Sequence, residues 1–475
     1  MNAPAKPPRS IADREAGLHR QLTSRQLSMI ALGGAIGTGL FLGSAVSVRV
    51  AGPGVILSYG VGALIALALM WALAEMTVVH PVAGSFGVFA EIYLNPWAGF
   101  AVRYSYWFAQ SVAIGSELVA VSIYCHYWAP GVPAWIWIVL FSAGMVFINA
   151  LNVGNFGTIE YWFALMKVTT IFVFLVLGTA LIFGIGYHPL GTHNYTAFGG
   201  FLPHGWTGVI LGVAIAIFSY LGLEVVSVAA GEASHPEIAV PRAMRWTLAR
   251  LALFYIGGMA VLVGVMPWTQ AGLAESPFVR VFQATGIPFA GAIMNFVVLT
   301  AALSSVNADL YLTTRMLFSL SRGGYAPEFV GKLNKKGVPL AALMISSVGM
   351  IIALILDLRF QESAFLYTLG AAFFGGLFGW GMIFVTHLAF RRRFEKNGGS
   401  VPMQFAPPGP WSSLAGTLAL LGVLISTWWI PGMKITILAG LPWLAFITLC
   451  YFLWKRTNRD RLSPGLHGGQ PPERA

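Results

Sequence analysis

The sequence predicts an all-α membrane protein with twelve transmembrane helices, and two observations support this prediction. The 475-residue chain is 57% hydrophobic and only 9% charged, whereas soluble proteins have roughly 25% charged residues. Apolar runs close to the length of about 20 residues that crosses a bilayer as a helix also follow one another with only short, turn-rich loops between them. The expected spans are 28–48, 54–79, 97–127, 135–151, 160–186, 207–231, 243–267, 284–314, 338–356, 363–390, 411–430 and 434–454.

The positions of lysine and arginine predict the orientation of these spans. If both ends of the chain are cytoplasmic, 23 of the 28 lysines and arginines lie on the cytoplasmic side and only four lie on the outer side. Cytoplasmic loops normally carry this excess. We therefore expect a transmembrane domain over 27–455 between two cytoplasmic tails, 1–26 and 456–475. The same excess accounts for the net charge of +11 without a nucleic-acid partner.

The sequence contains no pattern typical of an enzyme or a metal site. The two cysteines, Cys125 and Cys450, have neither CxxC nor Cys/His spacing. The nine histidines form no motif, and we find no arrangement of a nucleophile and a base. We therefore expect no metal, no cofactor and no enzymatic activity.

Two spans contain interruptions. The first span has a cluster of glycines at its centre, in ALGGAIGTGLFLG (31–43), and each glycine inside a helix costs up to about 1 kcal/mol relative to alanine. The sixth span is interrupted in a similar way around Ser219, Gly222 and Glu224. Interrupted helices at matching positions of two halves are typical of inverted-repeat transporters. We expect one repeat over about 28–186, a second over about 207–390, and two additional helices over about 411–454.

A break in the first span has a chemical consequence. Unwinding at Gly37, Thr38 and Gly39 exposes amides at the N-terminus of a half-helix, which favours a carboxylate. The sixth span would expose carbonyls near Phe218, Ser219 and Leu221, and carbonyls accept hydrogen bonds from an ammonium group. The two breaks together favour a zwitterion with adjacent amine and carboxylate. The alternative is that the glycines serve close packing between helices.

Longer motifs occur in a fixed order along the chain: LTSRQLSMIALGGAIGTGLF, AGPGVILSY, HPVAGSFGVFA, EYWFALMKV, FSYLGLEVV, GEASHPEIAVPRA and LNKKGVP. Over about residues 20–455 these motifs resemble the bacterial amino acid transporter family of the amino acid–polyamine–organocation (APC) superfamily. The resemblance implies a permease of the bacterial inner membrane with the 5+5 inverted-repeat (LeuT/APC-type) fold and broken helices 1 and 6. It also implies amino acid transport by alternating access, often with a proton.

The resemblance also implies a substrate site. The substrate carboxylate would meet the backbone of Gly37 and Gly39 and the side chain of Thr38. The amine would meet carbonyls at Ala35, Phe218, Ser219 and Leu221, and Phe218 takes the place of an aromatic gate. Further pocket candidates, which are mostly neutral and partly aromatic, are Ile114, Ser304, Ser305, Asn307 and Phe373. These residues favour a neutral or hydrophobic amino acid.

Ionisable residues inside the spans indicate function, because a charge in the bilayer is costly. Lys167 matches the lysine of the family motif FALxK, which in relatives takes the place of a coupling cation. We expect Lys167 to bind and release the coupled proton, or to mimic a cation in uncoupled exchange; a permanently paired structural lysine is the alternative. Glu117 and Glu224 match acidic family positions and are further proton-coupling candidates. Asp309 departs from the family pattern, which has a small residue there, and its role stays open.

The expected function is secondary active transport of a neutral or hydrophobic amino acid, coupled to a proton by symport. An amino acid exchanger, a channel and a non-transporting amino acid sensor are the alternatives, because broken helices are compatible with all of them. The expected partners are the amino acid and the lipid bilayer, with the proton as coupling ion. We expect no obligate heavy subunit, because Cys125 lacks an outer-loop context.

Near the second span, we expect Glu75 to form a structural pair and 80–90 to form a re-entrant or interfacial helix.

Overall fold

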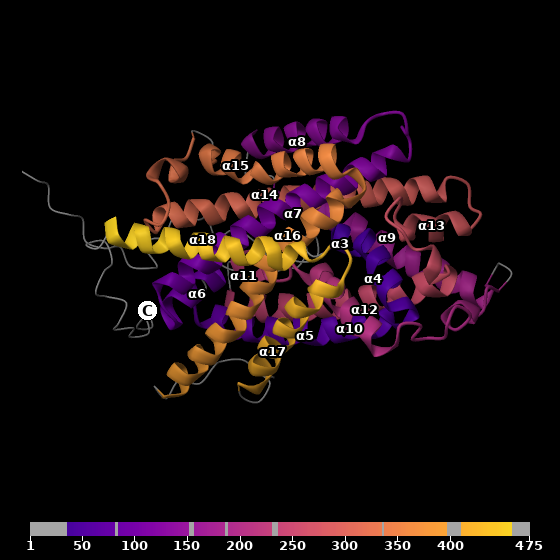
Figure 1. Ribbon diagram of the computed structural model, residues 1–475, viewed down its shortest axis with the longest axis horizontal. Helices are drawn as coiled ribbons and strands as arrows, with labels where there is room; N and C mark the ends of the chain where they lie inside the picture. Colours follow the sequence, from indigo (N-terminus) through magenta and orange to yellow (C-terminus); the bar gives the residue numbers. More distant parts are fainter. Residues whose placement is uncertain are drawn as a thin grey trace, which may run out of the picture.

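The computed structural model describes residues 36–80, 84–151, 156–185, 189–229, 236–334, 337–396 and 410–457. Every regular element within these ranges is a helix, and most of the long helices run roughly along the long axis of the molecule (Figure 1). In these ranges nine stretches are long and apolar enough to cross a membrane, and two apolar helices are shorter. The expected all-α membrane fold is confirmed, and each of the twelve expected spans has a helical counterpart.

The first half begins with the interrupted first span. Its described elements are α3 (Thr38–Phe41), α4 (Gly43–Ala51) and the 3₁₀ turn η1 (Gly52–Gly54), followed by α5 (Val55–Val79), α6 (Ser85–Tyr93), α7 (Pro96–His126), α8 (Ala134–Leu151) and α9 (Phe156–Phe183). Gly37 precedes α3 with an extended backbone, and Leu42 separates α3 from α4. The short helix expected near 80–90 is α6, which packs against α7.

The second half contains the second interruption. Its elements are η2 (His193–Tyr195), α10 (Gly205–Tyr220), α11 (Val225–Ala229), α12 (Pro236–Val265), η4 (Trp268–Gln270), α13 (Pro277–Ala284), α14 (Ala290–Arg322), η5 (Glu328–Gly331), α15 (Leu340–Ser346), α16 (Val348–Lys396), α17 (Trp411–Ser426), η6 (Thr427–Trp429) and α18 (Ile435–Thr457). The chain leaves helical geometry after Tyr220 and resumes it at Val225. Gly222 has a φ of 100° in this gap, a conformation that glycine adopts without the steric cost of a side chain.

The expected span 284–314 differs from the structure at its start. The helix α14 begins at Ala290, and residues 277–284 form the separate helix α13. Gly286 has a φ of 69°, and Pro288 disfavours a helical conformation at the residue before it. Because the expected span 284–314 is apolar over most of its length, its hydrophobicity did not indicate the turn between α13 and α14.

The ninth and tenth spans are joined more tightly than expected. The ninth span consists of α15 and the first part of α16, and the tenth span is the remainder of α16. In place of the loop expected between 356 and 363, helical geometry is interrupted only at Phe360 and Gln361, where α16 is kinked. Two apolar stretches, Leu340–Gln361 and Ser363–Arg393, correspond to the two expected spans.

The helix α7 lies at the centre of the molecule, where it packs extensively against α16 and α14 (Figure 1). Glycines allow the backbones of α7 and α16 to approach closely. A Cβ atom on Gly349 of α16 would collide with the carbonyl oxygen of Ser111, and one on Gly115 would lie 2.8 Å from the carbonyl oxygen of Gly349. Close backbone approach through small residues is a common basis of helix association in membranes.

Two buried glutamates form ion pairs, one between helices that are distant in sequence and one between consecutive helices. Glu75 of α5 accepts hydrogen bonds from Arg391 at 2.5 and 2.7 Å and lies 2.7 Å from the ring of His387, both on α16. The structural pair expected for Glu75 is thus present. Arg103 of α7 pairs with Glu91 of α6, and Glu91 also accepts a hydrogen bond from Tyr325 at 2.9 Å.

We predict that Gly349→Ala destabilises the protein, because the added methyl group meets rigid backbone of α7. Overpacking of this kind costs about 1–3 kcal/mol. The melting temperature of the purified protein in detergent should therefore fall.

Gly381→Ala on the same helix is the matched control, because a Cβ atom there meets nothing within 4 Å. Its melting temperature should stay the same or rise, since alanine is the better helix former by up to about 1 kcal/mol. An equal effect of both substitutions would contradict close packing between α7 and α16.

Candidate functional site

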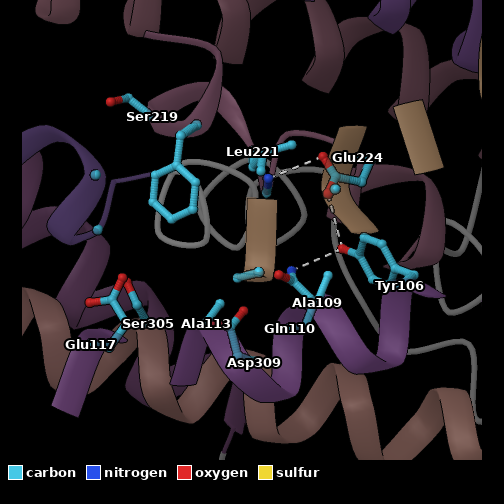
Figure 2. Close-up of a pocket in the computed structure, with 16 residues that line it drawn as sticks. Tyr106, Ala109, Gln110, Ala113, Glu117, Ser219, Leu221, Glu224, Ser305 and Asp309 are labelled. Atoms are coloured by element: carbon cyan, nitrogen blue, oxygen red, sulfur yellow. Dashed lines mark hydrogen bonds between the residues drawn. The ribbon is translucent and has the colours of Figure 1, made fainter. Parts of the chain in front are cut away.

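The two interrupted spans border a single cavity of about 50 Å³. It lies between the breaks and the helices α7, α14 and α16 (Figure 2). The lining residues are Gly37, Gly39, Tyr106, Ala109, Gln110, Ala113, Glu117, Phe218, Ser219, Leu221, Gly222, Glu224, Ser305, Asp309, Ala372 and Gly376. The cavity is smaller than the space of about 150 Å³ that holds a benzene molecule in an engineered protein, so a large side chain requires it to expand.

The breaks of the first and sixth spans touch each other. A Cβ atom on Gly39 would lie 3.1 Å from the ring of Phe218 and 3.1 Å from the Cα atom of Ser219. The hydroxyl of Ser219 is in turn 3.0 Å from the hydroxyl of Tyr59 on α5. Gly39 therefore permits a contact between the two broken spans that a larger residue would disturb.

A carboxylate of the chain itself occupies the N-terminus of the half-helix in the first span. The amide of Thr38 donates to the two carboxylate oxygens of Glu117 at 3.2 and 3.4 Å. The Thr38 hydroxyl also lies near this carboxylate, but it makes no well-formed hydrogen bond within the described chain. Lys167 of α9 is completely buried and acts electrostatically on Glu117. Anion binding at this position follows from the exposed amides and the helix dipole.

The break of the sixth span provides hydrogen-bond acceptors. The amide of Leu221 donates to the carbonyls of Ile217 and Phe218 at 3.1 and 3.2 Å. In the described part of the chain, the carbonyls of Ser219 and Leu221 accept no hydrogen bond. The Phe218 carbonyl already has a partner. Binding of a substrate ammonium by the carbonyls of Ser219 and Leu221 stays a prediction.

Glu224 lines the cavity and connects three parts of the chain, namely the break of the sixth span, α7 and α16. Its carboxylate accepts hydrogen bonds from the hydroxyl of Tyr106 at 3.1 Å, the indole N–H of Trp380 at 3.0 Å and the amide of Gly222 at 3.0 Å. The amide nitrogen of Gln110 donates to the same Tyr106 hydroxyl at 3.1 Å (Figure 2). Three donors offset much of the cost of burying this carboxylate, and they connect the sixth span to α7 and α16.

The structure brings together many of the predicted site residues. Those that line the cavity are Gly37, Gly39, Glu117, Phe218, Ser219, Leu221, Glu224 and Ser305. Thr38 and Lys167 are outside the lining and interact with Glu117. Ala35 lies outside the described residues.

Four predicted pocket residues are buried but do not line the cavity: Ile114, Ser304, Asn307 and Phe373. Asn307 faces α8 instead, where it accepts a hydrogen bond from Asn149 at 2.9 Å. Phe373 packs edge-to-face on Phe218, with ring centroids 5.8 Å apart. Phe373 therefore packs against the ring of Phe218, which is the residue predicted to form the aromatic gate.

Sequence reasoning named Glu117 of α7 but missed Tyr106 and Gln110 of the same helix, which also line the cavity. Tyr106, Gln110 and Glu117 are spaced by four and seven residues, which places them on one face of a helix. A polar stripe of this kind on an otherwise apolar span was a signal in the sequence. To interpret this stripe as part of the site, one would have to know that α7, rather than another helix, faces the breaks.

An all-α membrane protein in which two interrupted spans enclose a common cavity has the architecture of a secondary transporter. Residues 26–464 match the amino acid permease family, and the chain belongs to this family. Its class is therefore amino acid transport across a membrane, and the expected family and fold class are confirmed.

Several curated relatives are similar to the chain over almost its whole length. The aromatic amino acid transport protein AroP of Escherichia coli (strain K12) is 39% identical over 445 residues, which cover 93% of this chain and 97% of the relative. AroP of Salmonella typhimurium (strain LT2) is 40% identical over 448 residues, with the same coverage. The gamma-aminobutyric acid permease of Bacillus subtilis (strain 168) is 36% identical over 444 residues, 93% of this chain and 95% of the relative.

We predict that Gly39→Ala reduces transport without preventing folding, because the methyl group pushes the two breaks apart by a few tenths of an ångström. Displacement of groups around a reacting or binding centre can cost up to about 100-fold in rate. The measurement is the initial rate of amino acid uptake by the purified protein in liposomes.

Gly43→Ala is the control, because the nearest atoms to its Cβ would be at ordinary contact distances of 3.7 and 4.0 Å. It should keep close to the uptake rate of the unaltered protein. Equal losses in both variants would indicate that these glycines serve helix packing alone.

Proposed function

We propose that this permease is a proton-coupled symporter of a neutral amino acid. The observation that carries the proposal is the cavity lined by both breaks, by Gly37 and Gly39 of the first span and by Ser219 and Leu221 of the sixth. An amino acid head group has one anionic and one cationic end. Amides at a helix N-terminus suit the first, and carbonyls without intramolecular partners suit the second.

In this proposal the substrate carboxylate approaches the amides at Gly37, Thr38 and Gly39. In the structure Glu117 accepts the hydrogen bond from the Thr38 amide. A substrate carboxylate therefore has to displace Glu117 from this amide or share the amide with it. The substrate ammonium approaches the carbonyls of Ser219 and Leu221. Phe218 closes over the head group as a gate, with Phe373 packed behind it.

The preference for a neutral amino acid is supported by the walls of the cavity and by the relatives. Beyond the head-group position the lining includes the small residues Ala109, Ala113, Ala372 and Gly376. The names of the relatives refer to aromatic amino acids and to gamma-aminobutyric acid. These compounds differ in shape but share an amine, a carboxylate and the absence of net charge, which supports a zwitterion without further charge as substrate.

Coupling to a proton follows from the charges around the first break. A substrate carboxylate beside Glu117 brings two negative charges together, and like charges favour proton binding nearby. Lys167, which acts on Glu117, is the second group that can hold the proton. Because each ligand favours the binding of the other, substrate and proton bind with reciprocal coupling. The carboxylate of Glu224 is held by three donors. In this proposal it keeps the break of the sixth span in place while substrate and proton bind and leave.

We also propose that the protein lies in the bacterial inner membrane with both termini in the cytoplasm. The support is the unequal distribution of lysine and arginine, 23 against four in the expected loops and tails.

The test is uptake of a panel of labelled amino acids into proteoliposomes, with and without an inward proton gradient. For the unaltered protein we expect saturable uptake that the gradient stimulates. In Lys167→Ala and Glu117→Gln the stimulation should fall by about tenfold or more, since a group that takes part in proton transfer contributes at least 10²-fold in many systems.

Lys434→Ala is the control for loss of a lysine, because Lys434 is an exposed residue next to Trp428. It should keep full stimulation. Uptake that requires internal amino acid and ignores the gradient would make the protein an exchanger. Binding without flux would make it a sensor, and unsaturable flux would make it a channel.

A further inference from the structure

Tyr124 of α7 has a buried hydroxyl that the proposed transport site does not use. The residue is only 1% exposed, and its hydroxyl has no hydrogen-bond partner in the part of the chain that the structure describes. The backbone there is held in place, because the side-chain amide of Asn295 on α14 donates to the carbonyl of Tyr124 at 2.8 Å. A buried hydroxyl without a partner destabilises the folded state, so its presence at this position calls for an explanation.

Tyr124 lies on the same face of α7 as Glu117. The two residues are seven positions apart, which is nearly two helical turns and a rise of about 10 Å. Long side chains on a helix lean toward its N-terminus, and for Tyr124 this is the direction of Glu117. The two side chains also interact electrostatically. The Tyr124 hydroxyl is therefore a hydrogen-bond donor in the surroundings of the Glu117 carboxylate.

The other donors around Glu117 differ from Tyr124 in how they are used. The amide of Thr38 donates to the carboxylate, and Lys167 acts on it electrostatically. The hydroxyl of Ser305, which lies beside Glu117 (Figure 2), donates to a carbonyl of its own helix at 3.2 Å. The Thr38 hydroxyl belongs to the half-helix end that the substrate carboxylate approaches in the proposed site. Tyr124 does not line the cavity, so it can bind Glu117 without competing for the substrate.

We propose that Tyr124 is a positioning residue for substrate binding: when a substrate carboxylate takes the amide of Thr38, Glu117 turns to the Tyr124 hydroxyl and accepts a hydrogen bond from it. This inference rests on the proposed function, because the substrate carboxylate is the group that displaces Glu117. Glu117 then alternates between two donors, the Thr38 amide without substrate and the Tyr124 hydroxyl with substrate.

The physical basis is the cost of a buried carboxylate that loses its hydrogen bond. If Glu117 had no second donor, this cost would oppose the binding of a substrate carboxylate at the Thr38 amide. Hydrogen bonds to ionised groups are roughly twice as strong as those between neutral groups, so the Tyr124 hydroxyl offsets much of the cost. Without substrate the hydroxyl makes no hydrogen bond within the described chain. It therefore favours the substrate-bound state and contributes nothing to the stability of the substrate-free fold.

The test is Tyr124→Phe, which removes the hydroxyl and keeps the ring. The Kd of the purified protein is measured for each standard amino acid and for gamma-aminobutyric acid, and the melting temperature is measured without substrate. For each amino acid that binds, we expect the Kd to rise by about tenfold, the effect of one hydrogen bond to a charged group. The melting temperature should stay the same or rise, because phenylalanine leaves no buried hydroxyl without a partner.

Tyr127→Phe is the control for loss of a tyrosine hydroxyl. Tyr127 lies at the C-terminal end of the same helix and is 39% exposed. This variant should keep both the Kd and the melting temperature of the unaltered protein.

Glu117→Gln shows whether Tyr124 acts through Glu117. Glutamine has no charge and competes less for the Thr38 amide, so this variant should bind the same amino acids at least as tightly as the unaltered protein. Addition of Tyr124→Phe to it should raise the Kd by at most about threefold, because hydrogen bonds to uncharged groups are weaker. Non-additive effects of this kind are the mark of two residues that interact.

Four results would overturn the inference. An unchanged Kd in Tyr124→Phe would show that the hydroxyl has no part in binding. A lower melting temperature in this variant would show that the hydroxyl already has a partner in the substrate-free protein. An equal rise in Kd with and without Glu117→Gln would show that Tyr124 acts independently of Glu117. Loss of binding in a folded Glu117→Gln variant would show that Glu117 assists the substrate instead of competing with it.

Failure of the proposed function has a different result, namely that no amino acid binds to the unaltered protein or is taken up by it. Glu117 would then have no substrate carboxylate to displace it, and the inference would be overturned together with the proposed function. Normal binding and uptake by the unaltered protein, with no effect of Tyr124→Phe on the Kd, would overturn the inference alone.

Discussion

Backbone amides and carbonyls inside a bilayer are costly unless they find partners, and this constraint governs the centre of the molecule. In the first span α3 begins at Thr38 after the extended Gly37, and the amide of Thr38 binds the carboxylate of Glu117. The sixth span leaves helical geometry after Tyr220, and the amide of Gly222 binds the carboxylate of Glu224. Each break is thus stabilised by a glutamate, and both glutamates line one cavity.

The helix α7 links the two breaks. It provides Glu117 for the first break and Tyr106, which binds Glu224, for the second. Its position is fixed by close backbone contact with α16, where Gly115 and Gly349 leave no room for side chains. The two breaks are therefore in contact with one helix that is packed closely against its neighbours. This arrangement suits a transporter, in which occupancy of the site has to be connected to movement of the broken spans.

The cavity is lined partly by backbone groups at the breaks and partly by side chains, and this division relates to the different substrates for which members of the family are named. In the proposed site, backbone amides and carbonyls bind the amino acid head group whatever the surrounding side chains are. Other residues of the lining contribute side chains, among them Gln110 and Asp309. In the proposed site, substitution of these side chains would alter the choice of substrate without loss of head-group binding. Relatives named for aromatic amino acids and for gamma-aminobutyric acid, 36–39% identical to this chain, are compatible with this division.

The sequence by itself determined the class of the protein, the approximate limits of its spans and the location of both breaks. Hydrophobicity over about 20 residues is a local property, and so is the conformational cost of clustered glycines. Local signals failed where a turn lay within an apolar run, as between α13 and α14, or where the connection between two spans was only a kink, as at Phe360 and Gln361.

Only the tertiary structure decided which side chains meet at the breaks. Nothing in the sequence distinguishes Ser305, which lines the cavity, from Asn307, which binds Asn149 on another helix. The polar stripe of α7 was visible as a pattern, but its partner surface was not. Contacts between helices depend on how each one is rotated about its axis, and this rotation is fixed by packing among residues that are far apart in the chain. For that reason the occupation of the Thr38 amide by Glu117 emerged only from the folded molecule.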